Sequence, residues 1–95
     1  MVKHIVLWTV KEEFDKERAF NEINERFEQF VGSVPGLLSY SLHLGFQGYD
    51  ICLETEHESK EALDLYQEHP DHAAIKTIVA SYRDLRASCD FIVED

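Results

Sequence analysis

The sequence predicts a single α+β domain over residues 1–95, in which helices cover one face of an antiparallel sheet. Three observations predict this class. Short runs of β-branched, aromatic and aliphatic residues, typical of strands, occur near both ends of the chain and in its middle. Between them, apolar residues recur at steps of three and four, which is typical of amphipathic helices. A chain of 95 residues also has room for only one hydrophobic core.

The first elements predicted are a strand over residues 2–10 and a helix over residues 16–33. Both faces of the strand are substantially apolar: one carries Val2, His4, Val6, Trp8 and Val10, and the other carries Lys3, Ile5, Leu7 and Thr9. Asp15 is the expected N-cap of the helix. Pro35 and Gly36 form the turn that follows it.

A hairpin is predicted next. Residues 37–46 form its first strand, because apolar side chains alternate there with Ser39, Ser41 and His43. Residues 49–57 form its second strand, and a short turn at Gln47-Gly48 joins the two.

A broken helix and a final strand complete the chain. A helix over residues 60–68 begins at Ser59 and stops or kinks at Pro70. Asp71 is expected to cap a further helix, whose apolar side chains extend to Tyr82. Residues 85–93 form the last strand.

The predicted order β-α-β-β-α-β is that of the ferredoxin-like, or split βαβ, fold. Its sheet has the strand order 4-1-3-2, with both helices on one face. The second face would expose several large apolar side chains, which is an aggregation hazard. We therefore expect a homodimer in which two sheets pack face to face and form a dimeric α+β barrel.

The net charge of −10 argues against several classes of partner. The basic residues are interleaved with acids, so no positive face for nucleic acid or an anionic membrane is predicted. No apolar run approaches the roughly 18 residues of a membrane span, and the N-terminus does not resemble a signal peptide. The expected location is the cytoplasm. Cys52 and Cys89 fall on strands separated by a third, so both are expected to be free, buried thiols.

Two groups of residues are candidates for chemistry. His4 lies inside an apolar strand, and it is either a core histidine bonded to a neighbour or a site residue. The second group is the segment from Tyr66 to His72, which Pro70 interrupts. His69 is expected to cap a helix C-terminus, and His72, in the first turn of the next helix, is expected to be neutral and suited to act as a base or ligand.

No metal or cofactor is expected from the motifs. The His-x-x-His spacing lacks the HExxH pattern and an adjacent third ligand. The chain also contains no glycine-rich nucleotide loop, GxSxG elbow or redox CxxC pair.

Several segments together resemble the stress-responsive A/B barrel (Dabb) domain family. They are the opening run from Val2 to Trp8, Gly48-Tyr49-Asp50-Ile51, the run from Glu58 to Leu63, the run from Tyr66 to His72, and Asp90-Phe91. The resemblance covers essentially the whole chain, and its most specific part is the His-Pro-x-His segment combined with the strand-one histidine. It implies a dimeric α+β barrel.

The resemblance also implies candidate site residues. One branch of the family consists of polyketide cyclases, whose acid–base Tyr and His match Tyr66 and His72. Their strand-one histidine matches His4, whereas a further cavity histidine falls at Ile51. We therefore expect a ligand cavity lined by His4, Val6, Trp8 and Ile51, at one end of the barrel and beneath the partner's sheet.

Three functions remain open at this stage. The first is a stress-responsive A/B barrel protein of unassigned activity that binds a small, largely apolar or carbonyl-containing molecule. The second is a cyclase-like enzyme that uses Tyr66 and His72 as an acid–base pair. The third, by fold analogy alone, is a small cofactor-free or haem-using monooxygenase.

Overall fold

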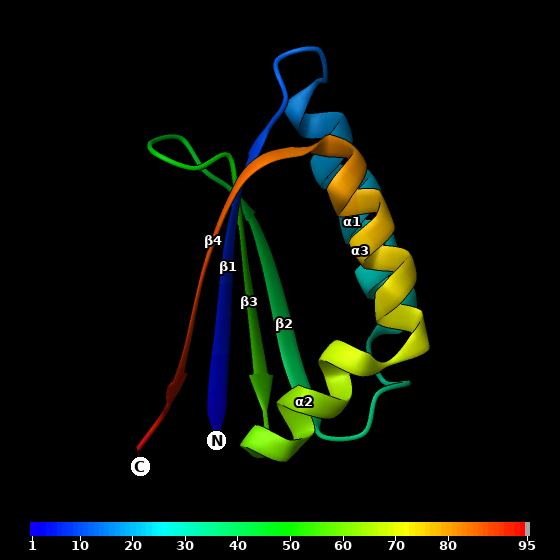
Figure 1. Cartoon of the computed structure of the whole chain (residues 1–95), viewed down its shortest axis with the longest axis vertical. Coiled ribbons are helices and arrows are strands. Elements are labelled where there is room, and N and C mark those ends of the chain that lie inside the picture. Colours follow the sequence, from blue (N-terminus) through cyan, green and yellow to red (C-terminus); the bar gives the residue numbers. More distant parts are fainter. Residues whose placement is uncertain (95) are drawn as a thin grey trace.

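The computed structural model describes residues 1–94, and in these residues four strands and three helices alternate in the predicted order. They are β1 (Val2–Val10), α1 (Lys16–Phe30), β2 (Leu37–Leu44), β3 (Ile51–His57), α2 (Lys60–Glu68), α3 (Pro70–Tyr82) and β4 (Arg83–Ile92). The sheet is antiparallel with the order β2-β3-β1-β4, which is the predicted order read from the other edge. The helices lie on one side of the sheet, with α1 beside α3 (Figure 1). The ferredoxin-like fold is therefore confirmed.

Strand β1 lies at the centre of the sheet and decides which side chains meet the helices. It pairs with β3 on one edge and with β4 on the other. Its side chains alternate strictly: Val2, His4, Val6, Trp8 and Val10 are buried, and the four between them are half-buried. The period of two thus places the predicted histidine and tryptophan on the helix-facing side.

The core fills the space between this face and the helices. Phe27 of α1 is fully buried and stacks on Tyr40 of β2, with ring centroids 5.4 Å apart. Ile75 and Val79 of α3 complete the same cluster. Burying each such side chain stabilises the fold by roughly 1.5–3 kcal/mol, so this face holds most of the hydrophobic stabilisation.

The predicted ends of the first helix and of the hairpin strands were wrong. Helix α1 ends at Phe30 rather than at residue 33, because Val31 is already extended and Gly32 has φ +95°. Strand β2 ends at Leu44 rather than at residue 46. The amide of Gly45 donates to the carbonyl of Asp50 at 2.7 Å, which closes a loop over residues 45–50 in place of the two-residue turn.

The last strand was also predicted too late. It begins at Arg83, directly after α3, and ends at Ile92. Cys52 and Cys89 are free, as predicted, but neither is fully buried: Cys52 is half-buried and Cys89 is exposed. In the part of the chain that the structure describes, no helix is both long enough and apolar enough to cross a membrane.

The face of the sheet opposite the helices is partly apolar and uncovered. By the register, Ile5 and Leu7 of β1 lie there beside Ala87 and Cys89 of β4. Leu85 and Phe91 continue the row along β4 and are exposed.

Candidate functional site

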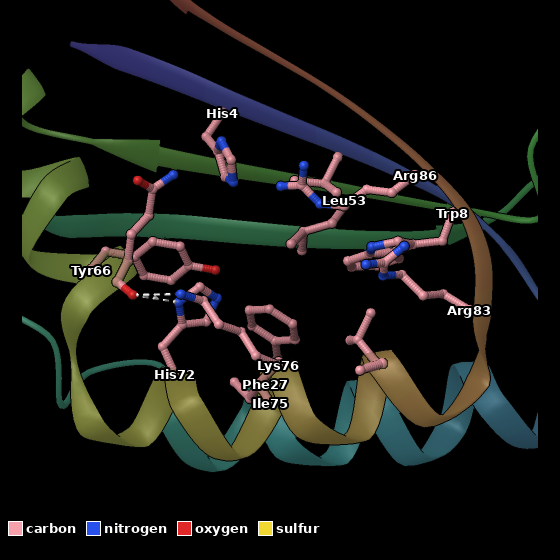
Figure 2. Close-up of a pocket in the computed structure, with 14 residues that line it drawn as sticks. His4, Trp8, Phe27, Leu53, Tyr66, His72, Ile75, Lys76, Arg83 and Arg86 are labelled. Atoms are coloured by element: carbon pink, nitrogen blue, oxygen red, sulfur yellow. Dashed lines mark hydrogen bonds between the residues drawn. The ribbon is translucent and has the colours of Figure 1, made fainter.

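A cavity of about 490 Å³ lies between the helix-facing side of the sheet and the helices α1, α2 and α3. Its walls combine apolar side chains with histidine, tyrosine and basic groups, and the residues discussed below are drawn in Figure 2. They are His4, Val6, Trp8, Phe27, Leu53, Tyr66, Gln67, His72, Ile75, Lys76, Val79, Ala80, Arg83 and Arg86. The cavity is partly open and is lined by residues of one chain on the helix-facing side, which differs from the expectation of a site beneath a partner's sheet.

Five of the six residues predicted for the site line this cavity. The alternation of β1 directs His4, Val6 and Trp8 into it, and the helices supply Tyr66 and His72. Ile51 does not line it. This residue is buried on β3 opposite Trp8, closer to the Val10 end of the strand.

The break between α2 and α3 shapes the helical wall of the cavity. Pro70 has no amide hydrogen, and His69 before it adopts the extended conformation that a following proline favours. The Nδ1 atom of His69 accepts from the amide of Asp71 at 3.2 Å, so His69, and not Asp71, is the N-cap of α3. His69 is also the C-cap of α2, as predicted, and its amide donates to the carbonyl of Tyr66 at 3.3 Å.

The same break frees the carbonyl of Gln67, which then orients His72. It accepts from the Nζ atom of Lys76 at 2.9 Å and from the Nδ1 atom of His72 at 3.4 Å, as the dashed lines in Figure 2 show. Because a carbonyl can only accept, the His72 proton lies on Nδ1. The Nε2 atom of His72 therefore keeps its lone pair.

Burial keeps His72 neutral. It lowers the pKa of His72 from 6.5 to about 4, and the charge of Lys76 acts in the same direction. The imidazole stacks on the ring of Tyr66, with centroids 4.3 Å apart. A neutral imidazole thus lies directly against a phenol.

Tyr66 is the most enclosed polar group of the site. Its side chain has no exposed surface, and its Oη atom has no hydrogen-bond partner among residues 1–94. Figure 2 shows the hydroxyl pointing into the cavity. Burial raises the pKa of Tyr66 above its ordinary value, so the phenol keeps its proton. It is therefore a hydrogen-bond donor that the protein leaves available.

His4 completes this end of the cavity. It lies opposite Asp90 in the β1–β4 register, and its Nδ1 atom donates to the Asp90 carboxylate. This bond fixes the orientation of the imidazole, whose centroid is 6.2 Å from that of the Tyr66 ring. His4 is thus bonded to a neighbour, as the first sequence-based interpretation requires, and it also lines the cavity.

His57 is a member of the cluster that the sequence analysis missed. It is fully buried at the end of β3, and its ring centroid is 4.8 Å from that of Tyr66. Its Nε2 atom lies 2.8 Å from the Thr55 hydroxyl, whereas Nδ1 has no partner among residues 1–94. Burial lowers the pKa of His57 to about 4. The sequence contains one signal for this position. His57 follows Thr55 by two residues in β3, so the alternation of the strand places both on the helix-facing side.

The cluster has a limited set of chemical roles. Among residues 1–94, no group of three or more histidine, cysteine or carboxylate side chains is arranged to hold a metal ion. What the site offers is a protonated phenol, a neutral imidazole with a free lone pair, and an apolar enclosure. This combination can donate a hydrogen bond to a carbonyl oxygen and accept a proton next to it.

The fold and the site define a ferredoxin-like α+β protein with an internal cavity lined by aromatic, histidine and basic side chains. The chain belongs to the stress-responsive A/B barrel domain (Dabb) family, whose model matches residues 2–93. No curated protein is similar to it at a significant level.

Solved structures with the same fold include proteins of differing description. A dimeric ferredoxin-like protein of unknown function from Bacteroides fragilis is 25% identical, with a TM-score of 0.85 over 95% of this chain and 93% of its own. A protein from Arabidopsis thaliana is also 25% identical, with a TM-score of 0.85 over 100% and 97%. The hydroxynitrile lyase from Passiflora edulis shares the fold at 12% identity, with a TM-score of 0.83 over 99% and 94%.

Proposed function

We propose that the cavity binds a small, largely apolar molecule that carries a carbonyl oxygen. The observation that carries this proposal is the buried Tyr66 hydroxyl, which points into the cavity without a protein partner. A buried hydroxyl left without a partner costs roughly 1–3 kcal/mol. A ligand carbonyl placed there recovers this free energy, and an alkane of the same shape does not.

The remaining walls support an apolar ligand. Val6 and Leu53 from the sheet, together with Phe27 and Ile75 from the helices, line the space around the polar cluster. The volume of about 490 Å³ lies within the roughly 300–1,000 Å³ typical of small-molecule sites.

The arrangement of His72 favours a second candidate, which is acid–base catalysis on the bound carbonyl compound. In this reaction the Nε2 atom of His72 takes a proton from the carbon beside the carbonyl. The electron pair of the broken C–H bond moves into the enolate, whose oxygen accepts a hydrogen bond from Tyr66. The resemblance of Tyr66 and His72 to the polyketide cyclase pair supports the same assignment.

The binding proposal is tested with acetophenone and with ethylbenzene, which has nearly the same shape but lacks the oxygen. Chemical shift titration should show tighter binding of the ketone to the wild-type chain. The preference should disappear in Tyr66→Phe, which removes only the hydroxyl. Equal binding of the two compounds to the wild-type chain would overturn the proposal.

The catalytic candidate has a separate readout. With the same ketone in D₂O, the chain should accelerate exchange of the methyl protons next to the carbonyl. General acid–base groups contribute roughly 10²–10⁴-fold to rate, and His72→Ala should remove about that much. Binding without any acceleration would leave a ligand-binding protein and eliminate the enzyme.

We further propose that the chain is a homodimer, joined through the uncovered face of the sheet. Support comes from the exposed Leu85 and Phe91 in the same row of β4 and from the half-buried Ile5 and Leu7 beside it. The Bacteroides fragilis protein with the same fold is dimeric. Two copies of this face would bury each other's apolar side chains.

A further inference from the structure

We propose that the end of the cavity near Trp8 binds an anionic group of the ligand, a carboxylate or a phosphate. This inference rests on the proposed binding of a carbonyl compound and adds a second anchoring point to it. The molecule as a whole has 19 acidic and 9 basic residues. Three of these nine, Lys76, Arg83 and Arg86, line this one cavity, whereas no aspartate or glutamate of residues 1–94 lines it.

The fold places the two arginines together at one end. Arg86 lies opposite Trp8 in the β1–β4 register, and Arg83 lies opposite Val10, where the register shifts. Figure 2 shows Arg83 beside Trp8 and the Arg86 side chain extending from the same end toward Leu53, whereas His4, Tyr66 and His72 gather at the other end. Two of the three cavity cations therefore enter from the Trp8 end, whereas the ammonium of Lys76 lies at the other end and donates to the Gln67 carbonyl beside His72.

No protein carboxylate neutralises these charges. Among residues 1–94, Lys3 and Lys16 form ion pairs with Glu56 and Asp50, but none of the three cavity cations lies within 4.0 Å of a carboxylate. Within residues 1–94, the Arg83 guanidinium donates only to the carbonyl of Asp84, at 3.3 Å.

The hydrogen bond of Arg86 is no stronger than that of Arg83. Its guanidinium donates to the Ser88 hydroxyl at 3.4 Å. A guanidinium has five N–H donors in a planar fork that matches carboxylate and phosphate oxygens. Both arginines thus keep most of their donors for an anion.

The opposite end of the cavity is less favourable for an anion, because the Lys76 ammonium there already donates to the Gln67 carbonyl. The Asp90 carboxylate lies behind His4 there, and its negative charge repels a second one. A ligand with one carbonyl and one anionic group therefore has one favoured orientation. Its carbonyl meets Tyr66, and its anion meets Arg83 and Arg86.

The test compares benzoylbutyrate, an aryl ketone with a terminal carboxylate, with its primary amide, which has the same length and no charge. Isothermal titration of the wild-type chain should show the carboxylate binding about tenfold more tightly, because hydrogen bonds to charged groups are the stronger ones and both arginines are partly solvated. The preference should shrink as salt is added. The double variant Arg83→Gln/Arg86→Gln should bind the two compounds equally.

Arg26→Gln is the matched control, because Arg26 is an exposed arginine on α1 that does not line this cavity. It lowers the net charge by the same amount per substitution and should keep the carboxylate preference. Thermal melts of all variants check that the fold is intact.

The outcomes separate the two proposals. If the amide binds as tightly as the carboxylate to the wild-type chain, the anion site is overturned and the carbonyl site stands. If neither ketone binds, both proposals fail. Within the anion site, the phosphate monoester of the matching keto-alcohol distinguishes the two anions: tighter binding than the carboxylate indicates a phosphate ligand, and weaker binding indicates a carboxylate.

Discussion

The Tyr66 hydroxyl is well placed to bind a ligand, but its burial lowers the stability of the folded chain. Its hydroxyl is buried without a protein partner, so removing it should relieve a desolvation cost. We expect Tyr66→Phe to raise the free energy of unfolding by about 1 kcal/mol, measured by urea denaturation, while the preference for the ketone over ethylbenzene is lost.

Tyr40→Phe serves as the control for this prediction. The Tyr40 hydroxyl donates to the side chain of Asn24 at 3.2 Å, so its removal breaks a bond instead of relieving a cost. This variant should lose stability or leave it unchanged. A loss of more than about 1 kcal/mol in Tyr66→Phe would show that the hydroxyl is stabilised in the folded chain.

The buried imidazoles of His57 and His72 predict a stability that falls on acidification. Each has a folded-state pKa of about 4, against an ordinary value of 6.5. The unfolded chain therefore binds protons more readily between these values, and protonation favours unfolding. Protonation of each histidine should lower the free energy of unfolding by about 2 kcal/mol between about pH 7 and about pH 5, before most carboxylates are protonated.

The pH dependence of urea denaturation checks this sign and size. The double variant His57→Gln/His72→Gln should show a much smaller loss over the same interval. His43→Gln is the control, since His43 is exposed on β2. If the double variant loses as much stability as the wild-type chain, the two imidazoles are not the groups responsible.

At the residue scale, the sequence predicted those cavity residues that strand alternation or the family resemblance indicated. His4, Val6 and Trp8 follow from the period of two along β1. His57 was missed because it ends a strand, and its approach to Tyr66 depends on how far α2 folds back over the sheet. Arg83 was missed because the last strand was expected to begin at residue 85, whereas it begins at Arg83, directly after α3.

At the scale of elements, one glycine sets how closely α2 approaches the sheet. Gly36 has φ +83°, and a Cβ atom there would lie 2.6 Å from the Cβ atom of Ala62 in α2. Gly48 has nearly the same φ, +84°, but no atom lies within 4 Å of its added Cβ. Alanine substitutions at the two positions therefore distinguish the cost of backbone strain, which both share, from the cost of steric crowding, which only Gly36 has.

We expect Gly48→Ala to cost about 1 kcal/mol of stability, from the left-handed backbone alone. Gly36→Ala should cost about 2–4 kcal/mol, because overpacking against Ala62 is added to the same strain. Urea denaturation of both variants measures the difference. Equal losses would mean that α2 moves away from the sheet without cost.

Element types were predictable because apolar periodicity distinguishes helices from strands, whereas their ends depend on local bonds. The N-cap of α3 shows this most clearly. Asp71 is a common capping residue, yet Pro70 already occupies the first turn, so the cap falls on His69 before it. That shift also frees the Gln67 carbonyl that orients His72.

At the scale of the whole molecule, the sequence predicted that both faces of the sheet are apolar. It did not predict which face lines the ligand cavity and which is left for association. From the sequence, the ligand cavity is expected on the face that a partner would cover. The structure places the cavity on the helix-facing side, within one chain. The opposite face is then free to serve association alone, so binding and dimerisation should be separable by mutation.

This separation gives the last prediction. Sedimentation of the wild-type chain should give about twice 11.1 kDa at micromolar concentration. Leu85→Lys places a charge in the apolar row of β4, and burying an unpaired charge in a dimer interface is strongly unfavourable. This variant should sediment as a monomer or dissociate at a much higher concentration, and its internal cavity should still bind the carbonyl probe.

Leu65→Lys is the matched control, because Leu65 and Leu85 are both 59% exposed but Leu65 lies on α2, away from the sheet. It adds the same charge and removes the same side chain, so it should leave the dimer intact. If Leu65→Lys dissociates the dimer and Leu85→Lys does not, the interface lies on the helices instead of on the sheet. A wild-type chain that sediments as a monomer and melts cooperatively would show that the uncovered face tolerates water, and that the barrel is not formed.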